Sequence, residues 1–203
     1  MSKIQSYDVC VNADQLSNAE ILLITALLIR GNYCNANKIY ISFAGSNMKE
    51  KAIITVSNAC AELGIPFKIL DSDPRQDRYY LWGNTLLTLL AKQCLLPRAH
   101  EKWKYKIRIP DSWCQLSNGR IQLINNLVFS IAKFYESRYA KTIIRLPDNY
   151  VLASRLQRLL NSINKRIQCR RGDSPGSCPV LWHVKYIDHP QIDIPKDDIS
   201  DLL

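Results

Sequence analysis

The chain has 203 residues, of which 47% are apolar and 22% charged, so it can bury an ordinary core and has the composition of a globular protein rather than a disordered one. Its seven cysteines are scattered and odd in number, which argues against a secreted disulfide framework and predicts a cytoplasmic protein. The most apolar run, residues 21–29, is about half the length that a membrane span needs. No membrane association is therefore expected.

Short apolar runs alternate along the chain with longer segments of helical period. Strands are expected at residues 7–11, 38–44, 67–73, 104–111, 141–148 and 180–188, and helices at 18–33, 48–63, 81–96, 118–139 and about 150–167. One strand between successive helices is typical of a parallel sheet that is covered on both faces. The pattern therefore predicts a Rossmann-like, three-layer α/β sandwich, with a mainly parallel sheet of about six strands and five helices. Residues 1–189 would form this single domain, and residues 190–203 a flexible acidic tail.

A short motif occurs twice, as RIPDSW at residues 108–113 and as RLPDNY at residues 145–150. Proline ends a strand because it cannot donate to the ladder, and an aspartate after it can cap the next helix. We interpret the motif as a strand-to-helix joint used twice, in which Asp111 and Asp148 are the caps.

Positive charge is concentrated in the second half of the chain. Residues 102–185 hold sixteen Lys and Arg against four Asp and Glu, whereas residues 1–100 hold ten against eight. Such an imbalance repels itself without a polyanion nearby, so this basic half predicts binding to DNA or RNA. One group of candidate residues follows the outer face of the last predicted helix, and the other interleaves lysine with an aromatic residue, which suits phosphate contact and base stacking. The candidates are Arg155, Arg158, Lys165, Arg166, Arg170 and Arg171, with Lys102, Trp103, Lys104 and Lys106.

Enzymatic alternatives rest on carboxylates at the expected strand ends. Asp71 and Asp73, joined by Asp14, Asp111 and Asp148, could bind Mg²⁺ at the carboxyl edge of a parallel sheet. That edge would suit a Mg²⁺-dependent nuclease or a nucleotide-handling hydrolase. A zinc site would need Cys169, Cys178, His183 and His189, whose spacing lacks a tight Cys pair. The chain has neither a G-x-G-x-x-G nor a P-loop motif. We expect no catalytic residues, no metal and no cofactor, and no known family is recognised from the motifs.

The last eighteen residues, 186–203, hold one lysine against five aspartates, interleaved with apolar residues. This tail could bind a protein partner, cover the chain's own basic surface, or be a plain disordered terminus. Together these features predict a non-catalytic nucleic-acid-binding accessory or regulatory protein of a nucleoprotein assembly. A protein-interaction module for an acidic partner is the remaining alternative.

Overall fold

The computed structural model describes residues 13–35, 38–70, 77–92, 113, 115–131, 133–134, 142–145, 150–163, 167–170 and 180–183. The helices are α1 (Asn18–Arg30), α2 (Lys49–Glu62), α3 (Asn84–Lys92), α4 (Asn118–Ile131) and α5 (Tyr150–Asn161), preceded by the short 3₁₀ helix η1 (Ala13–Gln15). The strands are β1 (Gly31–Asn35), β2 (Lys38–Ser42), β3 (Phe67–Lys68), β4 (Arg78–Trp82), β5 (Lys133–Phe134), β6 (Thr142–Arg145), β7 (Ile167–Arg170) and β8 (Val180–His183).

These strands form two antiparallel sheets, with strand orders β1-β2-β4-β3 and β5-β6-β8-β7. Every paired strand within them runs antiparallel to its neighbour. The predicted mainly parallel sandwich is therefore wrong. The physical reason is the number of strands between successive helices: two strands, such as β1 and β2 between α1 and α2, turn back on each other and pair as a hairpin.

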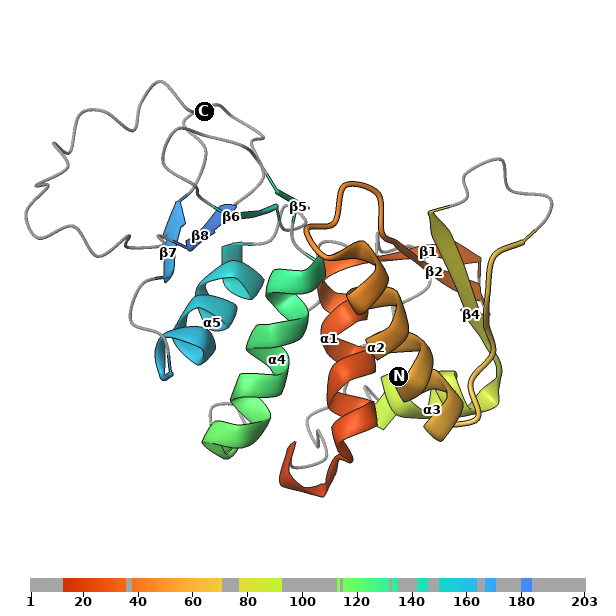
Figure 1. Ribbon diagram of the computed structural model, residues 1–203. Helices are drawn as coiled ribbons and strands as arrows, with labels where there is room; N and C mark the ends of the chain where they lie inside the picture. The colour runs from red at the N-terminus through yellow and green to blue at the C-terminus, as the bar shows by residue number, and fades with distance from the viewer. Residues whose placement is uncertain are drawn as a thin grey trace, which may run out of the picture.

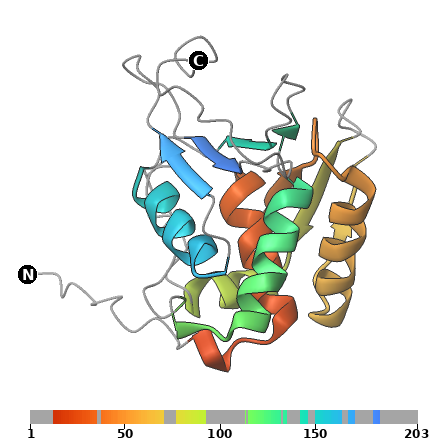
Figure 2. The same ribbon diagram turned by 60° about the vertical axis from the view of Figure 1, so that its left-hand side comes forward.

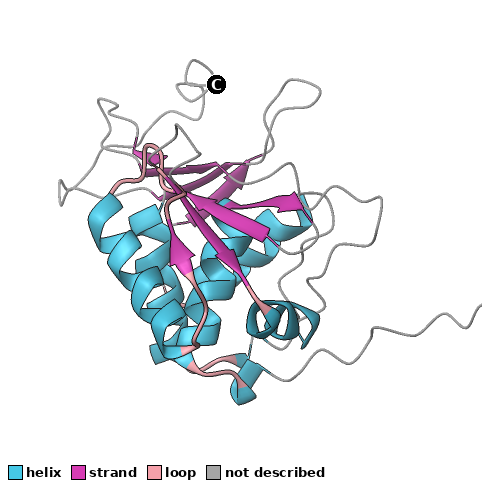
Figure 3. Cartoon of the chain, turned by 90° about the vertical axis from the view of Figure 1, so that its right-hand side faces the viewer, coloured by secondary structure: helices cyan, strands magenta, loops and turns pink. Residues whose placement is uncertain are grey.

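The helices lie on one side of the sheets. In Figure 1 helices α5, α4, α1 and α2 stand side by side, with β5–β8 above them and β4 to the right of α2, and Figure 3 shows helices and strands from the side. Figure 2 shows that the strands of both sheets remain on the same side of this helical layer. The described residues thus form two layers instead of the three expected, and each sheet has one face toward the helices and one away from them.

The fold contains an internal repeat of about 100 residues. The order α-β-β-α-β-β occurs as α1-β1-β2-α2-β3-β4 and again as α4-β5-β6-α5-β7-β8, with the same strand order in both sheets. Two sequence matches follow the same spacing: QLSN stands at residues 15–18 and 115–118, and Leu-Trp at residues 81–82 and 181–182. The structural repeat is therefore this unit of about 100 residues, and the two R-x-P-D motifs, which lie closer together in the sequence, do not mark it.

Helices α1 and α4, one from each repeat, pack against each other at the centre of the molecule. The core is continuous across both repeats and includes equivalent buried positions such as Ile24 with Ile124 and Leu27 with Leu127. Burial on nearly every side of α1 explains why its sequence is apolar over almost its whole length. Within the described residues, no helix combines the length and the hydropathy that crossing a membrane would require.

The ends of two helices follow ordinary capping chemistry. Ser17 and Glu20 form a capping box at the start of α1, and Gly64 follows α2 with a φ of 64°, as expected of a residue just past a helix. The predicted ends of two helices were wrong: α4 ends at Ile131 instead of residue 139, and α5 ends at Asn161 instead of about residue 167. Helix α4 begins at Asn118, seven residues after Asp111. Asp111 and Asp148 both lie outside the described residues.

Cys60 offers a test of the packing of α2. Its side chain is 1% exposed, and burial raises the pKa of its thiol to about 12. Because the thiolate is the reactive form, we expect iodoacetamide to label Cys60 slowly in the folded chain at pH 8 and quickly in urea, as measured by peptide mass spectrometry. Burial favours the protonated thiol, so Cys60 does not lower the free energy of unfolding below the ordinary thiol pKa of 9.0. As the pH rises from there to about 12, the unfolded chain loses its proton more readily and the free energy of unfolding decreases. Rapid labelling of the folded chain would contradict the packing.

Candidate nucleic-acid interface

The first sheet presents its polar and aromatic residues on the side away from the helices. Along β2 buried and partly exposed residues alternate, and Ile39 and Ile41 are the buried ones that join the core. Because side chains of a strand point alternately to opposite faces, Lys38, Tyr40 and Ser42 must point away from the helical layer. A strand of this pattern buries one face and leaves the other for contact with solvent or a ligand.

The strand register extends this surface over all four strands of the sheet. Lys38 pairs with Trp82, Tyr40 with Tyr80, and Ser42 with Arg78, whereas on β3 Lys68 pairs with Tyr80. Residues that pair directly across strands share a face. We call this surface the outer face, and it consists of Asn32, Lys38, Tyr40, Ser42, Lys68, Arg78, Tyr80 and Trp82. Three of these described residues are cationic and none carries a carboxylate.

The aromatic rings hold one of the cations in place. The guanidinium carbon of Arg78 lies 4.6 Å from the centroid of the Tyr40 ring, and the rings of Tyr40 and Tyr80 lie 5.5 Å apart. A cation over an aromatic face is attracted by the ring quadrupole, which restricts where the guanidinium can go. Tyr80 is only 6% exposed, so it supports this arrangement from within and is not itself a contact residue.

The exposed members of the outer face are suited to a polyanion. Lys68 is exposed, and Lys38, Arg78 and Trp82 are partly exposed. Lysine and arginine bind phosphates, and an aromatic ring beside them can pack on a sugar or a base. The nearest described carboxylate along the chain, that of Asp77 just before β4, forms an ion pair with Lys49. Its negative charge is thereby offset at the margin of the surface.

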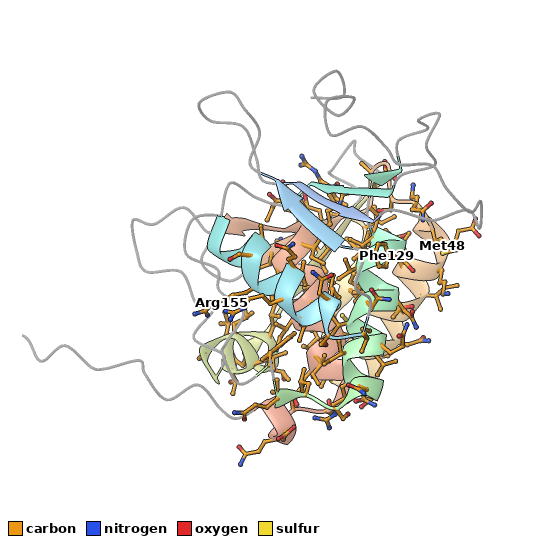
Figure 4. The ribbon with its side chains drawn as sticks, turned by 90° about the vertical axis from the view of Figure 1, so that its left-hand side faces the viewer. Met48, Phe129 and Arg155 are labelled. Atoms are coloured by element: carbon orange, nitrogen blue, oxygen red, sulfur yellow. The ribbon has the colours of Figure 1, made fainter. Side chains whose placement is uncertain are left out.

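The arginines predicted on α5 lie elsewhere. Helix α5 belongs to the helical layer, contacts β7 and β8, and contributes Leu156 and Leu160 to the buried core. Arg155 is partly buried and Arg158 exposed, and Figure 4 shows Arg155 on α5 at a distance from Met48 and Phe129. Because α5 ends at Asn161, it cannot carry Arg166 on the same helical face.

Most other candidates fall where the structure gives no side-chain detail. The backbone of Arg170 belongs to β7 and pairs with Val180. The remaining predicted residues lie outside the described part of the chain: Lys102, Trp103, Lys104, Lys106, Lys165, Arg166 and Arg171. The predicted basic set therefore stays a prediction. The structure reveals another basic surface, in the half of the chain whose charge is nearly balanced.

The two described sheets have no parallel carboxyl edge of the kind that motivated the enzymatic alternatives. In antiparallel sheets successive strands end at opposite edges, so strand ends that would meet in a parallel sheet are separated. Asp14 lies in η1 and is exposed, whereas Asp71, Asp73, Asp111 and Asp148 are not described. Among the described residues, no group of three or more His, Cys, Asp and Glu side chains could hold a metal ion.

The outer face was missed because its residues are spread over four short strands. The signal was present in KIYIS and RYYLW, in which basic and aromatic residues fall on alternate positions. The second of these segments was assigned to a loop and the start of a helix. Without the pairing of β2 with β4, nothing in the sequence places Lys38 beside Trp82 or Arg78 beside Tyr40.

Comparison with known proteins finds solved structures with a similar fold. No protein-family description and no curated protein matches the chain by sequence. Among solved structures, full-length DUF199/WhiA from Thermatoga maritima is similar, with a TM-score of 0.52 and 12% identity, over 88% of this chain and 55% of that one. The N-terminal LAGLIDADG domain of DUF199/WhiA is similar with a TM-score of 0.53 and 12% identity, over 88% of this chain and 81% of that one. The chain thus spans about half of the full-length WhiA structure.

Proposed function

We propose that this chain is a non-catalytic nucleic-acid-binding protein that acts as an accessory or regulatory component of a nucleoprotein assembly. The observation that carries the proposal is the outer face, where Lys38, Lys68 and Arg78 are interleaved with aromatic residues and no described carboxylate intervenes. A surface of this kind contacts phosphates through its cations and tolerates many sequences.

The fold and the charge support this proposal. The similarity to the LAGLIDADG domain of WhiA favours a nucleic-acid-binding regulator over an unrelated interaction module, and the net charge of +9 is the sign that a polyanion requires. The basic half, residues 102–185, would add a further contact surface through Arg155 and Arg158 on α5. The scattered cysteines favour a cytoplasmic setting for such a complex.

The proposal is tested by measuring binding of the full chain to duplex DNA, single-stranded DNA and RNA at two salt concentrations, with and without Mg²⁺. We expect binding without Mg²⁺, no cleavage, and an affinity that falls steeply as salt increases. Cleavage that requires Mg²⁺ would favour the nuclease alternative. No binding to any of the three at low salt would contradict the proposal and leave the module for an acidic protein.

The acidic tail gives a further expectation. Residues 190–203 carry four of the five aspartates of the C-terminal segment and lie outside the described residues. If this tail competes with nucleic acid for the basic surfaces, its deletion should strengthen binding at low salt, and added salt should reduce the gain because it screens the competing charges. Titrations of the full and truncated chains measure the difference. Equal affinity would show that the tail does not cover the binding surface.

A further inference from the structure

The end of α4 is capped by groups from the first repeat. The last carbonyls of a helix have no partner within the helix and must be satisfied from outside. The side-chain amide of Asn47 donates to the carbonyl of Phe129 (3.4 Å), and the backbone N–H of Met48 donates to that of Ser130 (3.0 Å). The guanidinium of Arg30 donates to the carbonyl of Ile131 through Nε (3.4 Å) and Nη2 (3.3 Å). Three consecutive carbonyls of the second repeat are thus held by the first.

Arg30 joins three elements at this point. It is the last residue of α1, and besides binding the end of α4 it donates to the carbonyl of Ala44, in the loop before α2 (3.1 Å). Because α1 and α4 both end here, the partial negative charges of two helix C-termini lie close together. A guanidinium between them offsets this charge, and its planar fork allows it to reach two carbonyls in a fixed geometry.

The cap lies where both sheets begin. Strand β1 starts at Gly31, directly after Arg30, and β5 starts at Lys133, two residues after Ile131. Figure 4 shows Met48 and Phe129 close together at the end of α4 that is nearest the strands. The cap therefore joins the two repeats at the point where their sheets start.

We infer that Arg30, with Asn47 and the backbone of Met48, is a positioning device that fixes the two sheets relative to each other, so that one nucleic-acid duplex can contact both. This inference rests on the proposed function. Two surfaces held at a fixed spacing bind one ligand more tightly than either does alone, because the second contact becomes intramolecular. Arg30 is assigned no contact with the nucleic acid.

The structure supplies a matched control. Arg120 of α4 also donates to a carbonyl of the other repeat, that of Asp14 (3.3 Å), but near the starts of α1 and α4. Arg30→Met and Arg120→Met remove the same charge and the same kind of contact between the repeats. Only Arg30→Met loosens the contact next to the sheets.

The experiment measures the affinity of each full-length variant for a duplex of about one helical turn, roughly 10 base pairs, and for one of about two turns. We expect Arg30→Met to keep the affinity for the short duplex within about twofold and to lower that for the long duplex about tenfold, whereas Arg120→Met should keep both. Arg30→Lys retains the charge without the fork and should fall between wild type and Arg30→Met. Asn47→Ala, which changes no charge, should weaken binding to the long duplex by a smaller factor.

The outcomes separate this inference from the proposed function. If the wild-type chain binds neither duplex but binds single-stranded DNA or RNA, the inference fails and the proposed function stands. If it binds none of them, both fail. If the wild type prefers the long duplex and Arg30→Met shows the same preference, only the inference is overturned. Should Arg30→Met not fold, as judged by circular dichroism, Asn47→Ala and Arg30→Lys decide: an unchanged preference for the long duplex in both would overturn the inference.

Discussion

Replacing Lys38, Lys68 and Arg78 together with methionine is expected to weaken nucleic-acid binding across all sequences alike. Each residue on the outer face that contacts a phosphate releases counterions, so the slope of log K against log salt should become shallower by about 0.9 per contact on duplex DNA and about 0.7 on single strands. The fold should survive because none of the three side chains belongs to the buried core. Titrations at four or more salt concentrations would measure both the affinity and the slope.

A control with the same loss of charge makes this result specific. Lys51→Met, Arg155→Met and Arg158→Met also remove three positive charges, but from the helical layer, on α2 and α5. If the outer face is the main binding surface, this second triple variant should lose less affinity than the outer-face variant and should keep a steeper salt slope. Loss of binding in the control, together with normal binding of the outer-face variant, would move the interface to α5 and contradict our assignment.

Gly31→Ala is expected to destabilise the folded chain by about 1–3 kcal/mol, which is the usual cost of forcing an additional group into a packed site. A Cβ at this position would lie 2.4 Å from the carbonyl oxygen of Leu27 and 2.9 Å from its Cα. These are backbone atoms of α1, so the junction between α1 and β1 would have to move. The backbone angles of Gly31 are those of an ordinary extended residue, so the cost is steric and not conformational.

Gly119 is the control for this prediction. It lies in the first turn of α4, and a Cβ there would have nothing within 4 Å. Since alanine is favoured over glycine in a helix by about 0.5–1 kcal/mol, Gly119→Ala should raise the melting temperature slightly. For a chain of this size we expect Gly31→Ala to lower it by about 2–4 °C per kcal/mol, as measured by thermal denaturation. Equal melting temperatures for Gly31→Ala and the wild type would contradict the close approach of β1 to α1.

The helices of the described chain could be located from the sequence because their signals are local. The spacing of apolar residues predicted a helix at residues 48–63, where α2 runs from Lys49 to Glu62, and the Ser17 cap marks the start of α1. Their ends were less certain. The predicted helices at 18–33, 118–139 and about 150–167 were too long, and their last residues contain β1, β5 and the start of β7.

Those missed strands decided the fold class. With one strand between helices the chain must cross over and form a parallel sheet, whereas with two it forms a hairpin and an antiparallel one. Strand β5 has only two residues, too few for a period of two to be recognised. Strand β4 was hidden because RYYLW holds two adjacent buried residues, Tyr80 and Leu81, and so does not alternate in burial.

The amino-acid sequence alone was sufficient for the positions of the helices, the excess of positive charge and the expectation of a polyanionic partner, since each depends on composition or on residues within one or two turns of each other. The outer face and the cap on α4 required the tertiary structure. Tyr40 meets Arg78 across 38 positions of the chain, and Arg30 meets Ile131 across 101. Contacts of that kind are set by how the two repeats pack and how their strands pair, and no local pattern in the sequence encodes that pairing.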